Sequence, residues 1–228
     1  MPSQNASLDN SISRVESTAD AFEILSLLTL LPTRQIAQGV WSGALQKDMH
    51  AIAHELELGN IENTPEMHES FPYAANEEDV LEEMRRAYTA LFTHPKKPLV
   101  AITEMSFVDE KAHAKISSSA FLNEAALHAE ACYKKSGFAL SNETSREPGD
   151  HMGIELEFLA KVHINLATAL INEDEEQQQR WAERIKEFNS HMRTWGIDFF
   201  EACRNTAPNA FYAWAASFGS SFMRAYLS

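Results

Sequence analysis

Apolar residues recur at helical spacing along most of the chain, and prolines and glycines mark the expected helix ends. The spacing predicts a helix over residues 20–31 that ends at Pro32. Thr33 can cap a second helix that runs to about Leu58. Because β-branched residues nowhere cluster and Ala, Leu, Glu, Lys and Gln dominate long windows, the pattern indicates helix rather than strand.

Further helices are expected from Asn76 to Phe92, from about Ser117 to Lys135, from near Asp150 onward, through Cys203, and from Pro208. Pro95 and Pro98 end the first of these, and Gly137 ends the second. The intervening segments 59–76 and 94–107 contain several prolines and are predicted to be irregular.

One predicted helix is far more apolar than the others. It carries a stripe of residues at helical spacing, which is widened by Ile154, Phe158 and Val162: Met152, Leu156, Leu159, Leu166 and Leu170. A helix this apolar is expected near the centre of a helical domain. His163 falls on the same stripe, where a hydrogen-bonded core histidine is the favoured interpretation.

The domain organisation that follows is simple. Residues 1–16 are polar and are predicted to form a disordered tail, and residues 17–228 are predicted to form one all-helical domain. Hydrophobic residues make up 44% of the chain, which is enough to build a core. The predicted fold class is therefore all-α.

Composition narrows the range of partners. The chain has 33 acidic and 19 basic residues, for a formal net charge of −14. Such a surface repels phosphate backbones, so nucleic-acid binding is not expected. The same charge attracts a basic partner and speeds its encounter with the protein.

Compartment signals point to the cytoplasm. Cys132 and Cys203 lie far apart and are expected to be free thiols in a reducing environment. The polar N-terminal residues contain no apolar export segment. The longest apolar run, residues 24–31, is too short to cross a bilayer, so direct membrane insertion is not expected.

Motifs for catalysis are scarce in the sequence. It contains no Gly-rich phosphate loop, no GxSxG and no HExxH. His50 and His54 lie one helical turn apart and could share a cation in a metal-dependent enzyme, but no third ligand is evident and a surface pair is favoured. Of the Glu-x-x-His motifs expected in pairs in a di-iron bundle, only Glu110 with His113 is present.

The stretch REPGDHMGIELEFL, residues 146–159, concentrates several chemical groups at the start of the apolar helix. Pro148 fixes the backbone before the helix, and Asp150 can cap exposed amides. His151 and Glu155 are one turn apart and can pair, while Glu147 lies in the preceding loop. With no nucleophile or metal motif beside them, the residues alone leave a capped, salt-bridged helix start as the simplest interpretation.

The chain resembles the TorD/DmsD/NarJ-like chaperones, which mature redox enzymes. Residues 147–151 are similar to the E-P-x-D-H hallmark of that family, and the segment of Tyr88, Leu91 and Phe92 is similar to its aromatic-x-x-L-F segment. A poorer match begins at Glu104, where Phe107 replaces a tyrosine of the family and removes a hydroxyl. A fourth match joins His191 and Trp195 with the aromatic residues that follow them. Together these segments cover roughly residues 77–226.

The resemblance implies a single-domain helical bundle of the TorD/DmsD type without catalytic activity. It implies a cytoplasmic chaperone that binds the twin-arginine signal peptide, and the apo catalytic subunit, of a molybdopterin-dependent oxidoreductase until its cofactor is inserted. It also leaves open guanine nucleotide binding, and either a monomer or a domain-swapped dimer. No metal or other cofactor is expected. The alternative within the family is an assembly factor that binds a mature reductase subunit rather than a leader.

These expectations assign roles to particular residues. Glu147 and Asp150 would pair with the leader's guanidiniums, and His151 would orient one of these carboxylates or contact the peptide backbone. Pro148 would belong to the same site. Tyr88, Leu91 and Phe92 share one helix face and would form an apolar wall for the rest of the leader, with the Tyr88 hydroxyl at a wet edge. Glu155, Glu104 and Trp195 would support the site.

Overall fold

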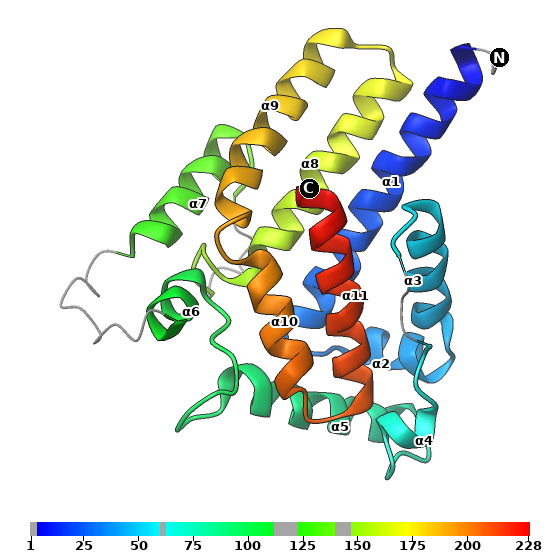
Figure 1. Ribbon diagram of the computed structural model, residues 1–228, viewed down its shortest axis with the longest axis vertical. Coiled ribbons are helices and arrows are strands. Elements are labelled where there is room, and N and C mark those ends of the chain that lie inside the picture. The colour runs from blue at the N-terminus through cyan, green and yellow to red at the C-terminus, as the bar shows by residue number, and fades with distance from the viewer. Residues whose placement is uncertain (1–3, 60–62, 112–122, 140–146) are drawn as a thin grey trace.

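The computed structural model describes residues 4–59, 63–111, 123–139 and 147–228, and these residues form helices joined by short connections (Figure 1). Within these ranges no β-strand occurs, which confirms the predicted all-α fold. The helices are α1 (Gln4–Thr29), α2 (Arg34–Trp41), α3 (Ala44–Glu55), α4 (Met67–Ser70), α5 (Glu77–Tyr88), α6 (Glu104–Lys111), α7 (Glu124–Lys135), α8 (Met152–Ile171), α9 (Glu175–Met192), α10 (Gly196–Thr206) and α11 (Ala210–Leu227). A π-helical turn, η1 (Thr89–Thr93), continues α5.

Helix α8 lies between α1 and α9, and α10 and α11 form a helical hairpin beside them (Figure 1). The first two turns of α8 are buried on all sides except at Glu157, which agrees with the prediction that the helix is central. Leu166 and Leu170, near its other end, are only half-buried. The core is rich in aromatic side chains, among which Phe22 of α1 contacts Phe222 and Tyr226 of α11 edge to face.

The predicted disordered tail is wrong for residues 4–16. Helix α1 begins at Gln4 and runs unbroken into the buried segment around Phe22. Its polar half is anchored on α3, where the Ser13 hydroxyl donates to Glu55 Oε1 at 2.8 Å and Arg14 donates to the Glu55 carbonyl at 3.2 Å. These contacts join residues about forty positions apart, so the local pattern of polar residues gave no sign of them.

The segment from Thr33 to Leu58 forms two helices rather than the predicted single one. Thr33 caps α2 through its side chain, as expected, by accepting from the Ile36 N–H. The break comes at Gly43, which has a φ of 74° and precedes α3. A positive φ is the conformation that glycine adopts at low cost, and it redirects the chain between the two helices.

Capping residues in the sequence predicted several other helix ends correctly. Asn76 caps α5 by accepting from the N–H groups of Glu78 and Asp79, and Gly137, with a φ of 82°, follows the end of α7. Two short helices were missed: α4, which lies within 59–76, and α6, which begins within 94–107 and ends at Lys111. The expected start of α7 near Ser117 lies outside the described residues.

Both cysteines are free and buried, as the sequence predicts. Burial raises the pKa of the Cys132 thiol and that of the Cys203 thiol, which disfavours the reactive thiolate in both. Among the described helices, none combines the length and apolar character that crossing a bilayer requires.

Candidate functional site

The N-terminus of α8 is capped by a different residue from the one expected. His151 is the N-cap residue, and its Nδ1 accepts from the Gly153 N–H at 3.1 Å. The predicted capping of α8 by Asp150 is therefore wrong. Because Nδ1 is the acceptor, the proton of the neutral imidazole lies on Nε2. Burial lowers the pKa of His151 to about 4, so the ring is neutral near pH 7.

Asp150 is fully buried and holds the neighbouring helices in place. Its Oδ2 accepts from the Met105 N–H at 3.2 Å at the start of α6, and its Oδ1 accepts from the Asn123 side-chain amide at 3.0 Å before α7. Its carbonyl accepts from the Glu104 N–H at 3.0 Å. Both carboxylate oxygens are thus committed to the fold, and Asp150 lies too deep to meet a ligand at the surface.

A short antiparallel contact reinforces this connection. Thr103 and His151 form an isolated β-bridge, and the Met152 N–H donates to the Ile102 carbonyl at 2.9 Å. Segment 102–104 therefore lies against the start of α8, although the two are nearly fifty residues apart in sequence. The poorly matching segment around Glu104 and the E-P-x-D-H hallmark are parts of one site.

Gly149 fits where a side chain would not. A Cβ added there would lie 2.6 Å from Glu130 Cγ and 2.9 Å from the Ala126 carbonyl oxygen of α7. The Gly149 carbonyl also accepts from the buried Tyr133 hydroxyl at 2.7 Å. Glycine at this position of the motif therefore permits α7 to pack closely against the segment that precedes α8.

Glu147 is the accessible carboxylate of the segment, with 47% of its side chain exposed. Its Oε2 lies 3.9 Å from His151 Nε2, which is too far for a hydrogen bond. Burial, followed by the nearby charge of Glu147, raises the pKa of Tyr88 to about 12, so the hydroxyl stays protonated. Glu147, His151 and Tyr88 consequently form one neighbourhood. The exposed Pro148 lies between them in sequence, and its carbonyl accepts from the His151 N–H at 3.0 Å.

The expected apolar wall is part of the core. Tyr88, Leu91 and Phe92 are all buried, and Phe92 stacks on Phe199 with ring centroids 5.9 Å apart. Leu91 and Phe92 line an internal cavity of only about 20 Å³. Tyr88, the last residue of α5, is only 5% exposed as a whole, and the position of its hydroxyl at a wet edge stays a prediction.

A second polar cluster lies behind Asp150, where α6, α8 and α9 meet. His191 Nε2 is 2.7 Å from Glu155 Oε1 and 3.4 Å from Glu104 Oε2. The Thr194 hydroxyl donates to the other oxygen of Glu104 at 3.0 Å. The predicted pairing of Glu155 with His151 is therefore replaced by a pairing with His191.

Among the described residues, only His191 pairs with the two carboxylates of this cluster. Burial raises the pKa of Glu155 to about 7, and the neighbouring Glu104 and Asp150 act in the same direction. Burial disfavours a charged His191, but the hydrogen bond and the negative charges around it raise its pKa overall. The pair therefore shares a proton near neutral pH. Trp195, the third predicted supporting residue, is buried and packs against Phe107 with ring centroids 5.9 Å apart.

His191 is the residue that sequence reasoning placed in a motif without giving it a role. Its partner Glu155 lies on the buried apolar helix, and a buried acid there needs a partner from another element. This need for a partner was the feature of the sequence that could have revealed the cluster. The identity of the partner depended on how α9 packs against α8.

Other candidate residues are separate from this site. His50 Nε2 hydrogen-bonds to the Thr64 hydroxyl at 2.6 Å, and the described residues place no metal-ligand cluster around His50 and His54. His163 is a core histidine, as predicted, and its Nδ1 donates to the Leu159 carbonyl at 2.7 Å. His113 lies outside the described residues.

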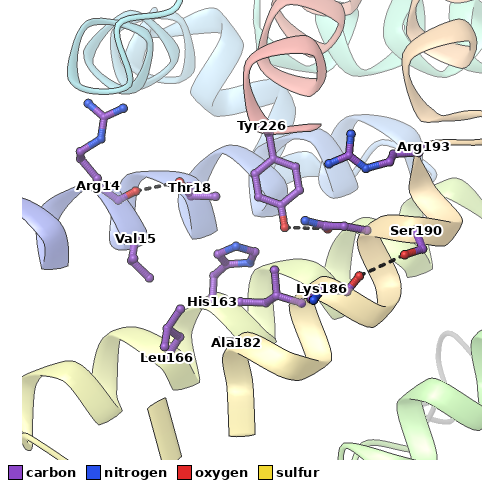
Figure 2. Close-up of a pocket in the computed structure, with 12 residues that line it drawn as sticks. Arg14, Val15, Thr18, His163, Leu166, Ala182, Lys186, Ser190, Arg193 and Tyr226 are labelled. Carbon is purple, nitrogen blue, oxygen red and sulfur yellow. Dashed lines mark hydrogen bonds between the residues drawn. The ribbon is translucent and has the colours of Figure 1, made fainter. Parts of the chain in front are cut away.

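A cavity of about 500 Å³ lies between α1, α8, α9 and the end of α11. Figure 2 shows that Arg14 of α1, and Lys186 and Arg193 at α9, contribute to its lining, together with Tyr226 and His163. Arg14 is already bonded to the Glu55 carbonyl and paired with Glu57, and Arg193 donates to the Leu227 carbonyl. The remaining positive charge still makes this cavity a poor match for a peptide that carries adjacent arginines.

Comparisons with known proteins identify the family. The model of the family described as nitrate reductase delta subunit matches residues 45–201, which is more than half of the chain. The match includes the E-P-x-D-H segment and the cluster of Glu104, Glu155 and His191. Searches of curated proteins and of solved structures found no match. The chain therefore belongs to the nitrate reductase delta subunit family, a family of chaperones of the NarJ/TorD type.

Proposed function

We propose that this protein is a cytoplasmic chaperone that binds the twin-arginine leader of a molybdopterin-dependent oxidoreductase and delays export until the cofactor is inserted. Membership of the family supports a role in the maturation of molybdoenzymes. The proposal adds the leader as the segment that is bound. A twin-arginine leader offers two guanidiniums and then an apolar segment, and each needs a matching surface.

The observation that carries the proposal is the half-exposed Glu147 carboxylate. No lysine or arginine among the described residues forms an ion pair with it. It lies beside the neutral His151, and its charge raises the pKa of the nearby Tyr88. A guanidinium can bind such a carboxylate through two parallel hydrogen bonds.

The structure changes which residues take part. Asp150 holds α6 and α7, so in this proposal it positions the segment rather than touching the leader. The apolar part of the leader needs an exposed surface instead of the buried wall formed by Tyr88, Leu91 and Phe92. Leu99 is 51% exposed, and its N–H donates to Ala90 of η1 at 3.2 Å, which places it beside that turn. We propose Leu99 as part of the apolar contact.

The role of Glu147 is tested by calorimetric titration of Glu147→Ala with a leader peptide. Loss of a guanidinium partner from a partly desolvated site should weaken binding about tenfold or more, or about 1.4 kcal/mol. Glu23→Ala, which removes an exposed acid from α1, is the matched control for net charge and should bind like the wild type. Equal affinities for Glu147→Ala and the control, with both proteins folded, would remove Glu147 from the site.

The second candidate is binding of a mature reductase subunit, and the description of the family as a nitrate reductase subunit favours considering it. The two candidates predict different results in a pull-down with the client subunit, produced with and without its leader. Capture that depends on the leader supports the first. Equal capture of both forms supports the second.

We also propose that a guanine nucleotide, whose binding the family resemblance leaves open, binds in the cavity shown in Figure 2. Its support is the presence of Arg14, Lys186 and Arg193 around a cavity of about 500 Å³ in a protein that is otherwise acidic. Phosphates pair well with such cations. Titration with GTP should show binding that Lys186→Ala weakens, and unaltered binding by this variant would place the nucleotide elsewhere.

A further inference from the structure

A buried cluster of two carboxylates and one imidazole stands apart from the surface position of Glu147. Glu104 comes from α6, Glu155 from α8 and His191 from α9, so the three helices converge on it. One potential ligand atom from each residue lies within 4.8 Å of the others. Glu155 is fully buried, while the side chains of Glu104 and His191 are 13% and 7% exposed.

The cluster contains an oxygen that the described residues leave unpaired. Glu155 Oε1 is bonded to His191, but Glu155 Oε2 is buried and no donor among the described residues reaches it. An unpaired buried carboxylate oxygen is costly, because it loses its hydration without gaining a partner. Within the described part of the chain, no lysine or arginine forms an ion pair with Glu104 or Glu155. A cation that Glu155 binds through both of its oxygens, and Glu104 through one, would remove this deficit.

We propose that Glu104, Glu155 and His191 bind one divalent transition-metal ion, of which Zn²⁺ is the type. Ligand bonds of about 2.1 Å in a tetrahedral arrangement set neighbouring donor atoms about 3.4 Å apart. The separation between His191 Nε2 and Glu104 Oε2 is already 3.4 Å. The contact between His191 Nε2 and Glu155 Oε1, at 2.7 Å, holds a proton that the metal displaces.

The choice of a transition metal follows from the donor atoms. Imidazole nitrogen suits Zn²⁺ and its neighbours in the first row, whereas Mg²⁺ and Ca²⁺ prefer oxygen donors alone. Three protein ligands leave a fourth position open, which is typical of an exchangeable site. The Thr194 hydroxyl shares its proton between Glu104 Oε1 at 3.0 Å and the His191 carbonyl at 2.8 Å, and so helps to orient that carboxylate, as outer hydrogen bonds do at metal sites.

The proposed site would join three helices directly behind the E-P-x-D-H segment. The N–H of Glu104 donates to the Asp150 carbonyl, and Asp150 in turn precedes His151, the cap of α8. A bound ion would therefore stabilise the arrangement that positions Glu147. Because metal binding involves none of the surface contacts of the leader, either proposal can fail without the other.

The test is calorimetric titration of chelator-treated protein with Zn²⁺ alone. We expect one Zn²⁺ per chain, and Co²⁺ bound in its place should give the visible absorption of a low-coordinate site. Glu155→Gln keeps the shape of the side chain but removes its charge, and it should weaken Zn²⁺ binding by about a hundredfold or more. The less buried Glu104→Gln should act in the same direction, which keeps the test valid if Glu155→Gln fails to fold.

A double variant, His50→Gln with His54→Gln, is the control for adventitious binding by surface histidines, and it should retain the site. The proposal is overturned if Zn²⁺ binding disappears in this control, or if Glu155→Gln and Glu104→Gln bind Zn²⁺ like the wild type. It is also overturned if the wild-type protein binds no Zn²⁺. If Glu155→Gln then abolishes binding of the leader peptide, the cluster binds an arginine of the partner instead.

Discussion

At the scale of single residues, two acids three positions apart have opposite surroundings. Glu147 is half-exposed and has no cationic partner among the described residues, whereas Asp150 is buried with both oxygens bonded. The sequence could not separate their roles, since both precede the helix in a loop and both are carboxylates. The difference arises because Met105 and Asn123, which are distant from Asp150 in sequence, donate to its carboxylate.

This difference predicts that Asp150→Ala lowers stability. Its removal leaves the partly buried Met105 N–H and Asn123 amide without their acceptor, which should cost about 3 kcal/mol in the free energy of unfolding. The matched control is Glu110→Ala, which removes an exposed acid from α6, the helix to which Asp150 bonds, and it should change stability by less than about 0.5 kcal/mol. Chemical denaturation measures both, and equal stabilities for the two variants would contradict the assigned role of Asp150.

His163 gives a second prediction at this scale. Burial lowers its pKa to about 4 in the folded protein, against about 6.5 when unfolded. The unfolded state therefore binds more protons between these values, so the contribution of His163 to stability falls as the pH drops below about 6.5. Between pH 8 and pH 5 the wild type should lose about 2 kcal/mol more than His163→Gln. Parallel stability curves for the two proteins would show that His163 is not held neutral.

At the scale of elements, capping residues and glycines correctly predicted the helix ends that they form. Thr33, Asn76 and Gly137 mark helix ends through contacts within a few residues, and all three were found in the expected roles. The first half of α1 and the start of α6 were missed because Glu55 and Asp150, which secure them, are about forty residues away in sequence. The E-P-x-D-H segment was identified, but its connection to α6 was not.

The close contact between α7 and the start of α8 predicts that Gly149→Ala is destabilising. The added Cβ would meet the Ala126 carbonyl oxygen at 2.9 Å, and backbone must shift to relieve it, at a cost of about 1–3 kcal/mol. Gly59→Ala is a suitable control, because a Cβ there meets nothing within 4 Å. Thermal unfolding should therefore show a lower midpoint for Gly149→Ala only, and a similar midpoint for both variants would be evidence against the tight approach.

At the scale of the whole molecule, the fold places the half-exposed Glu147 carboxylate on the surface of a densely packed helical core. The all-α class and the central α8 could be predicted from apolar spacing, because this pattern directly determines which faces are buried. The convergence of Glu104, Glu155 and His191 could not, since it depends on the packing of three separate helices. The net charge of −14 would attract a basic leader and speed its encounter with the protein.

The most direct test of leader recognition is a calorimetric titration of the wild-type protein with the leader of its client enzyme. We expect binding heat at tens of micromolar peptide, and at least about tenfold weaker binding when both arginines of the leader are replaced by lysines, which cannot form the same paired hydrogen bonds. No heat above background with the arginine-containing leader, or equal affinity for the lysine-containing peptide, would contradict recognition of the twin arginines.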